Sequence, residues 1–120
     1  MAGHSLSFDS ILDLCQKQHR RIVLAVLAEE GQSLTLTELT ETVLKYTHHT
    51  PLTAVSENVK TETRLSLYHV HLPKLASEEL ITMDQERQLV EPTEQFEQVQ
   101  PTVSTVLDAD PTLKGPIELS

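Results

Sequence analysis

Seven consecutive apolar residues, at positions 22–28, place the strongest constraint on how this chain can fold. They lie within a longer stretch, residues 8–30, whose apolar side chains recur at three- and four-residue steps, which predicts one helix or two in succession. A helix that is apolar on nearly all sides must be surrounded by other elements. Seven residues are also far fewer than the ~20 needed to cross a bilayer. We therefore expect this helix at the centre of the core.

Composition narrows the class of protein further. The chain has 120 residues and is 38% hydrophobic, which suffices for one core rather than two. Aromatic residues make up only 3%, so aliphatic side chains must fill that core. A single cysteine, Cys15, excludes an internal disulfide and a multi-cysteine zinc finger. With no recognisable signal peptide, we expect a soluble, cytoplasmic protein without a membrane partner.

Residues suited to helix ends divide the chain into segments. Several side chains can act as N-terminal caps: Ser7 or Asp9, Thr37 and Ser56. Gly31 is suited to end the first helical stretch, since glycine adopts the left-handed conformation at little cost. These positions predict a short extended segment at residues 33–36, a second helix from Thr37 and, after a loop, a third helix over residues 57–79.

The third helix has a predicted core side and a predicted outer side. At 100° per residue, the core side carries Leu65, Tyr68, Leu72, Leu75 and Ala76. The outer side carries Thr63, Ser66, Leu67, Val70 and Lys74. Pro73 lacks an N–H group and cannot bond to the carbonyl of His69, so we expect a bend or a break there.

A β-hairpin is predicted after the third helix. Residues 80–83 and 88–91 are strand-like, and the polar residues 84–87 between them suit a turn. Thr93 can then cap a short helix that Pro101 breaks, with one more helical turn beyond. The apolar residues of this last region either form a dimer contact or fold back on the domain: Phe96, Val99, Val103, Val106 and Leu107.

The order helix, short strand, helix, loop, helix, hairpin is that of a winged helix-turn-helix. We therefore predict an α+β, mainly α fold of three helices plus a β-hairpin wing, with a short C-terminal helical extension. The expected divisions are a flexible N-terminus at 1–8, the winged helix-turn-helix domain at 9–92, a dimerising helical extension at 93–108, and a loosely ordered acidic tail at 109–120.

Four sequence blocks strengthen this prediction: "LDLCQKQHRRIVLAVLAEEG", "HHTPLT", "LSLYHVHLPKLASEELITMD" and "RQLVEPTEQF". Over residues 9–100 they resemble a family of small winged helix-turn-helix proteins from halophilic archaea whose function is unknown. Its most specific block, HHVHLPKL, is written here as YHVHLPKL. Many relatives have Ala-Gly where this chain has Glu78-Glu79, just before the hairpin. The resemblance implies, by fold, a transcriptional regulator.

Negative charge is concentrated in the last third of the chain. The net charge is −9. Residues 1–75 have seven Lys/Arg against eight Asp/Glu, which gives −1, and residues 76–120 have two against ten, which gives −8. Surface carboxylates keep proteins soluble in concentrated salt, where the screening length at about 1 M is about 3 Å. The acidity therefore neither excludes nor supports binding to DNA.

The outer side of the third helix is the main candidate for contact with DNA. Five of its side chains can meet bases or phosphates: Thr63, Ser66, His69, Val70 and Lys74. Arg87, at the hairpin tip, is placed to reach phosphate or the minor groove. The same helix face could instead be solvated or form a protein interface, which Leu67 and Val70 would suit.

The remaining polar clusters favour structural roles. Lys17, Arg20 and Arg21 could clamp phosphate, but pairing within the protein is favoured because the first helix of such domains lies away from the groove. His69 and His71 point about 200° apart on a helix and cannot share one ion. His48, His49 and Cys15 match no zinc-site spacing.

No catalytic residue, metal ligand or cofactor is predicted, since the chain has no glycine-rich phosphate loop and no carboxylate pair that stands out. The chain is therefore not expected to be an enzyme, and no small-molecule substrate is evident. The main hypothesis is a homodimeric, DNA-binding transcriptional regulator. The alternatives are a protein-interaction module that kept the fold without binding DNA, and a metal-responsive sensor, which would require the histidines to converge.

Overall fold

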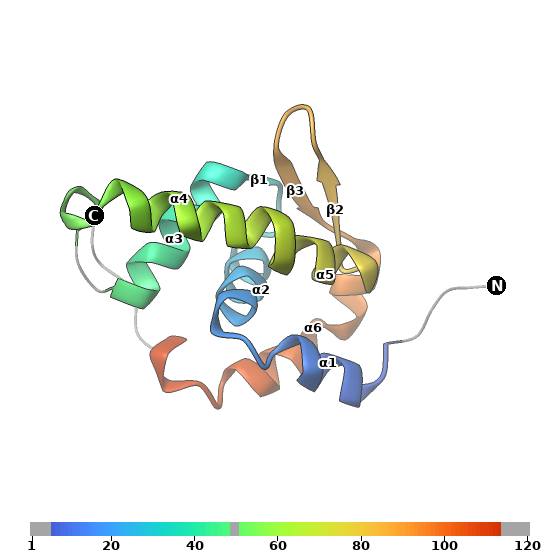
Figure 1. The fold of residues 1–120 in the computed structure, drawn as a ribbon. Coiled ribbons are helices and arrows are strands. Elements are labelled where there is room, and N and C mark those ends of the chain that lie inside the picture. Colours follow the sequence, from blue (N-terminus) through green and yellow to red (C-terminus); the bar gives the residue numbers. More distant parts are fainter. Residues whose placement is uncertain (1–5, 49–50, 114–120) are drawn as a thin grey trace.

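A computed structural model describes residues 6–48 and 51–113 of the chain. The fold is mainly helical with one small antiparallel sheet (Figure 1). The helices are α1 (Phe8–Leu14), α2 (Gln18–Glu30), α3 (Leu36–His48), α4 (Glu57–Ser66), α5 (Leu72–Ser77) and α6 (Glu94–Leu107). The strands are β1 (Leu34–Thr35), β2 (Ile81–Asp84) and β3 (Leu89–Pro92). Short helical turns lie at Leu52–Ala54, Leu67–His71 and Pro111–Leu113.

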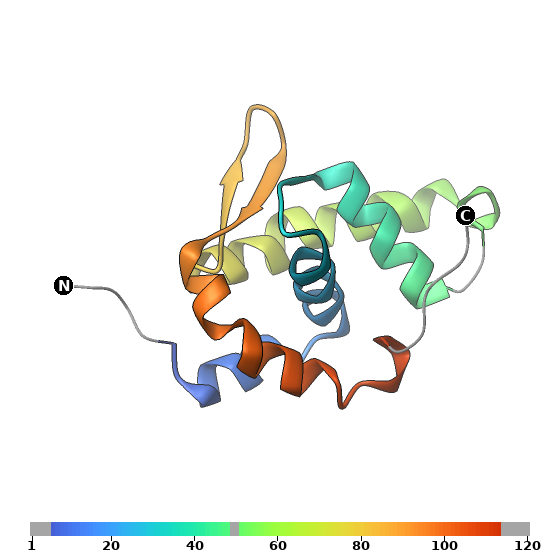
Figure 2. The same ribbon diagram turned by 180° about the vertical axis from the view of Figure 1, so that it is seen from behind.

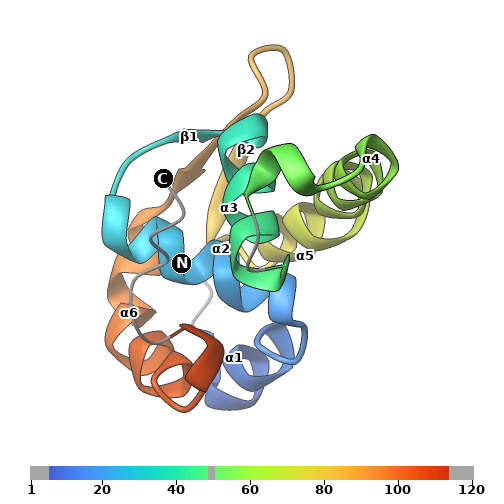
Figure 3. The ribbon, with the colours of Figure 1, turned by 90° about the vertical axis from the view of Figure 1, so that its left-hand side faces the viewer.

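Helix α2 occupies the centre of the molecule, as its apolar run predicts. Ile22, Val23 and Leu24 are fully buried. In Figure 3 the hairpin lies at one end of the molecule and α1 and α6 lie at the other, with α2 between them. Within the described residues, no helix is long and apolar enough to cross a membrane.

The first helical stretch is two helices, which was one of the two predicted forms. Ser7 caps α1, because its hydroxyl accepts a hydrogen bond from the backbone N–H of Ser10 at 3.1 Å. The guanidinium of Arg20 donates to the carbonyl of Leu14 at 2.7 Å, and so supplies a hydrogen bond to a carbonyl at the C-terminal end of α1 that has no donor within the helix. Gly31 ends α2 in the left-handed conformation, at φ 66°. Each of these ends follows the expected capping chemistry.

Helix α3 begins at Leu36, and its cap is Thr35, two residues before the predicted cap Thr37. The hydroxyl of Thr35 accepts from the backbone N–H of Glu38 at 3.0 Å, and the N–H of Thr35 donates to the Glu38 carboxylate at 2.8 Å. This reciprocal pair is a capping box, whose Thr-x-x-Glu signature is present in the sequence. It fixes the direction in which the chain leaves β1.

The predicted hairpin is confirmed, and it belongs to a three-stranded sheet. Strand β3 lies between β1 and β2 and is antiparallel to both, with Val90 paired to Leu34 on one side and Met83 on the other. Glu79 adopts φ 64° at the corner before β2, so a glutamate takes the left-handed position that a glycine would occupy without strain. The N–H of Leu80 bonds to the carbonyl of Leu75, which closes the end of α5.

The predicted facing of the third helix is wrong in its first half. Leu65 is 50% exposed, whereas Thr63 and Leu67 are buried at 7% and 0% exposure. The cause is a π turn at Leu67–His71, in which the N–H of Leu72 bonds to the carbonyl of Leu67, five residues back. Such a turn contains one residue more than an α-helical turn, and it therefore shifts the directions of the α4 side chains relative to those of α5. As a result, Leu67 and Leu72 both point into the core. The interruption of the helix that Pro73 predicts is therefore present, as a π turn.

Helix α6 is one continuous helix, so the predicted break at Pro101 is wrong. Thr93 caps it as expected, since its hydroxyl accepts from the N–H of Phe96. Phe96, Val103 and Leu107 join the core that surrounds α2. Figure 2 shows α6 beside α1 and α2, so the fold-back alternative describes this segment.

The ends of the described chain also belong to this core. Leu6 is buried at 9% exposure, within the segment that the sequence predicted to be flexible. On the C-terminal side, the carboxylate of Asp110 lies 2.7 Å from Nε of Arg21. Residues 109–113 of the predicted loose tail are thus placed by a specific contact, while residues 114–120 lie outside the described part.

Candidate functional site

Arg64 lies where α3, α4 and the hairpin meet. From α4, its guanidinium donates to the hydroxyl of Thr37 at 3.2 Å and to the side-chain carbonyl of Gln88 at 2.5 Å. Thr37 is in the first turn of α3, and Gln88 immediately precedes β3 at φ 53°. One cationic side chain therefore holds three elements at a common surface.

A groove between α3 and α4 adjoins this junction. Its volume is about 230 Å³. Lys60 and Arg64, four residues apart on α4, line one wall, and Thr37 and Thr40 line the other. The ammonium of Lys60 lies 3.4 Å from the exposed carboxylate of Glu57. The groove presents two cationic groups beside hydroxyls, together with the carboxylates of Glu41 and Glu57.

The turn of the hairpin is held by Asp84. Its carboxylate accepts from the backbone N–H groups of Glu86 and Arg87, at 3.1 and 3.2 Å, and lies 3.0 Å from Nε of Arg87. These hydrogen bonds from Arg87, first the backbone one and then the side-chain one, lower the pKa of the Asp84 carboxyl. Arg87 remains 76% exposed, at the edge of the turn.

The residues predicted to contact DNA do not share one surface. Thr63 is buried on the inner side of α4, which contradicts its predicted outer position, and Ser66 is half-buried. His69 and Val70 are exposed, as predicted. The ammonium of Lys74 lies 3.4 Å from the carboxylate of Asp13 on α1. Figure 1 shows α1 and the hairpin on opposite sides of α4 and α5, so Lys74 and Arg87 face different ways.

Sequence reasoning missed the groove beside Arg64. The signal was present, because Lys60 and Arg64 are spaced four residues apart and lie on one side of a helix. A straight-helix projection obscured it, since it placed Thr63, before the π turn, and Lys74, after it, on one common outer side.

The profile of one protein family matches most of the sequence. The profile of a domain of unknown function, DUF7344, matches residues 12–91. The chain belongs to the DUF7344 family. The search of curated proteins and the search of solved structures each found no match. The DUF7344 match runs from the middle of α1 to β3 and includes Arg64, Gln88 and the YHVHLPKL block, whereas α6 lies beyond it.

The most buried polar cluster of the DUF7344 region lies beneath the π turn. Nη1 of Arg20 lies 3.4 Å from Nδ1 of His71. Arginine can only donate, so Nδ1 is the acceptor and the ring of His71 is neutral. Burial, then the charges of His19, Arg20 and Lys17, lower the pKa of His71 to about 4. The rings of His19 and His71 meet edge to face, with centroids 5.3 Å apart.

This cluster is a packed junction within the DUF7344 domain. Among the described residues, no three histidine, cysteine or acidic side chains are grouped closely enough to hold a metal ion. His49, one of the ligands considered from the sequence, lies outside the described part. Cys15 is buried, and burial raises the pKa of its thiol. Arg20 and Arg21 pair within the protein as expected, although their partners are helix-end carbonyls and Asp110.

Proposed function

We propose that this chain is a winged helix-turn-helix domain that binds DNA. In this assignment α2, α3 and α4 are the three helices, α4 is the recognition helix, and β2 and β3 form the wing. The observation that carries the proposal is the Arg64 junction, because it joins the start of α3, the side of α4 and the hairpin into one surface. A duplex laid on that surface would meet all three elements.

Each part of this surface has chemistry suited to a duplex. Lys60, Arg64 and the exposed Arg87 supply positive charge for phosphates. The N-terminal end of α3 adds the positive end of the helix dipole, which Glu38 in its first turn partly offsets. Thr61, exposed on α4 beside the groove, can donate to or accept from base edges. In the revised assignment, Lys60, Thr61 and Arg64 replace Thr63, Ser66 and Lys74.

Salt conditions decide how this interface can be measured. Glu57 and Asp84 already pair with Lys60 and Arg87, so part of the positive charge is compensated within the protein. Phosphate contacts weaken as salt rises, while repulsion between acidic surfaces and DNA is screened. Binding should therefore be measured across KCl concentrations from about 0.1 M to about 2 M.

Selection of DNA sequences from a random pool, followed by gel-shift titration, tests the proposal. The wild-type protein should enrich a defined sequence, and Arg64→Ala should weaken its binding by about tenfold or more, the loss of a charged hydrogen bond. Lys74→Ala is the matched control, since it removes one exposed positive charge on the side facing α1. Absence of any enriched sequence, or equal losses in the two variants, would contradict the proposal.

A protein-interaction module is the second candidate function. It is favoured by Leu65 and Val70, which are 50% and 54% exposed near the middle of the third helical segment. Apolar side chains in such positions are typical of protein interfaces. In this case Leu65→Ser with Val70→Ser would abolish capture of a partner from a cell extract while the Arg64→Ala variant retained it.

A further inference from the structure

We propose that the cleft between α2, α3 and α6 binds a small organic cation, namely an amine with an apolar body. The cleft has a volume of about 1000 Å³, which lies at the upper end of the range for small-molecule sites. It adjoins the C-terminal ends of these helices, away from the groove beside Arg64. Binding there is independent of the DNA-binding proposal and can be tested without DNA.

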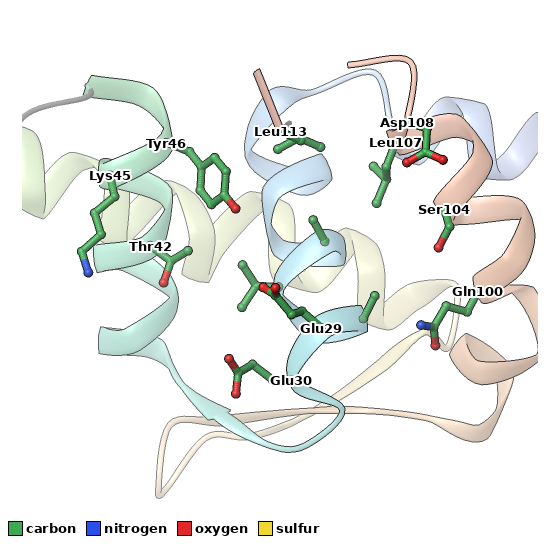
Figure 4. A pocket seen from close by; sticks show the side chains of 13 residues that line it. Glu29, Glu30, Thr42, Lys45, Tyr46, Gln100, Ser104, Leu107, Asp108 and Leu113 are labelled. Atoms are coloured by element: carbon green, nitrogen blue, oxygen red, sulfur yellow. The ribbon is translucent and has the colours of Figure 1, made fainter. Parts of the chain in front are cut away.

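The apolar part of the cleft comes from short side chains on α2. Ala25 and Ala28, one turn apart, leave α2 partly uncovered between α3 and α6. Tyr46 from α3 and Leu107 from α6 form facing walls (Figure 4). This arrangement provides an apolar surface on three sides, which suits a flat or aliphatic ligand body.

Polar groups converge on the middle of this cleft. Figure 4 shows the hydroxyl of Tyr46, the carboxylate of Glu29 and the hydroxyl of Ser104 directed into the space between the helices. They come from α3, α2 and α6 respectively. Burial and the charge of Glu29 raise the pKa of the Tyr46 hydroxyl, which therefore remains a neutral donor and acceptor. A ligand in the cleft would meet one anionic group flanked by two hydroxyls.

The charge of the cleft selects a cation. Three carboxylates line it, from Glu29, Glu30 and Asp108, against one ammonium, from Lys45, which leaves a net charge of −2. The carboxylates lie at the C-terminal ends of α2 and α6, where the helix dipoles are also negative. All three carboxylates are exposed to solvent, at the rim of the cleft, where they can meet a cation that enters it.

Geometry distinguishes an organic cation from a metal ion. No group of three acidic, histidine or cysteine side chains close enough to hold a metal exists in the described part of the chain. The carboxylates are instead distributed around a wide, partly apolar space. An ammonium group hydrogen-bonded to Glu29, with its hydrocarbon body against Ala25, Ala28 and Tyr46, satisfies both features.

Titration followed by two-dimensional ¹⁵N NMR of the full chain tests the inference, with phenethylamine as the probe. We expect saturable shifts in the backbone signals of Ala28, Tyr46 and Ser104. Two analogues with the same ring, 2-phenylethanol and 3-phenylpropionate, separate the contribution of charge from that of the apolar body. Neither should produce saturable shifts at these positions.

Glu29→Gln should weaken phenethylamine binding by about tenfold, because it removes the charge and keeps the shape. Glu97→Gln is the matched control, since Glu97 is exposed on α6 and does not line the cleft. Saturable shifts that are lost in Glu29→Gln and kept in Glu97→Gln would support the inference. Absence of saturable shifts, equal response to the neutral analogue, or equal affinity in the two variants would overturn it.

Discussion

Arg20 and His71 form a buried polar contact that joins α2 to the π turn. The sequence predicts no shared ion for His69 and His71, because their positions diverge on a helix. It could not reveal that His71 meets Arg20, since those residues are 51 positions apart and their contact depends on how α2 crosses the π turn. Helix caps were easier to predict from the sequence, because they are local. The hydroxyls of Ser7, Ser56 and Thr93 each accept a hydrogen bond from the backbone N–H three residues later.

Protonation of His71 should make folding depend on pH. Its pKa is about 4 in the folded protein, against 6.5 when unperturbed. The stability associated with the neutral ring is complete above pH 6.5 and is lost as pH falls from 6.5 towards 4. Between about pH 7.5 and about pH 5.5 the loss should be about 1 kcal/mol, measured by urea unfolding at each pH.

Two variants isolate the contribution of His71 from that of other titrating groups. His71→Gln keeps an acceptor for Arg20 and has no titrating ring, so stability should fall less between these pH values than in the wild type. His69→Gln, which changes an exposed histidine near the same turn, should keep the wild-type pH dependence. An unchanged pH dependence in His71→Gln would show that the buried ring does not carry the effect.

Local pattern predicted the existence of the main elements more successfully than it predicted their orientation. The hairpin and the third helical segment follow from periodicity, caps and turn residues, all of which act over a few positions. The π turn does not follow from them. Pro73 required an interrupted hydrogen bond, but whether the chain bends, breaks or inserts a residue depends on how Leu67 and Leu72 fit the core.

Truncation of Leu65, on α4, and of Leu67, in the π turn, tests the orientation that this turn produces. Leu67→Ala should reduce the free energy of unfolding by about 2–5 kcal/mol, because it leaves a cavity beside α2. Leu65→Ala should change it by less than about 0.5 kcal/mol, since that side chain is half-exposed. A straight α-helix predicts the opposite ranking, so denaturant unfolding of these two variants decides between them.

At the scale of the whole molecule, α6 packs against the core although it lies beyond the family match. Proline spacing suggested a break at Pro101, yet Phe96, Val103 and Leu107 complete the core around α2. A tertiary contact can retain a helix across a proline when the flanking turns are buried, which sequence pattern alone does not indicate. Of the two predicted roles, a dimer contact or a fold-back on the domain, the packing of these three side chains follows the second.

If this protein is a homodimer, α1 is the surface best suited to form it. Phe8 and Leu12 are four residues apart on α1 and are 57% and 41% exposed. Figure 1 shows α1 on the opposite side of the molecule from the hairpin. A two-fold contact through α1 would therefore leave the surface around Arg64 of both copies free for two half-sites.

Sedimentation velocity over a range of protein concentrations tests this arrangement. The wild-type protein should sediment with twice the mass of one chain, and Phe8→Ser with Leu12→Ser should sediment as a monomer that remains folded by circular dichroism. Leu65→Ser is the matched control, because it removes an equally exposed leucine from α4 and should leave the dimer intact. A wild-type monomer at every concentration, or dissociation caused by Leu65→Ser instead, would exclude α1 as the dimer surface.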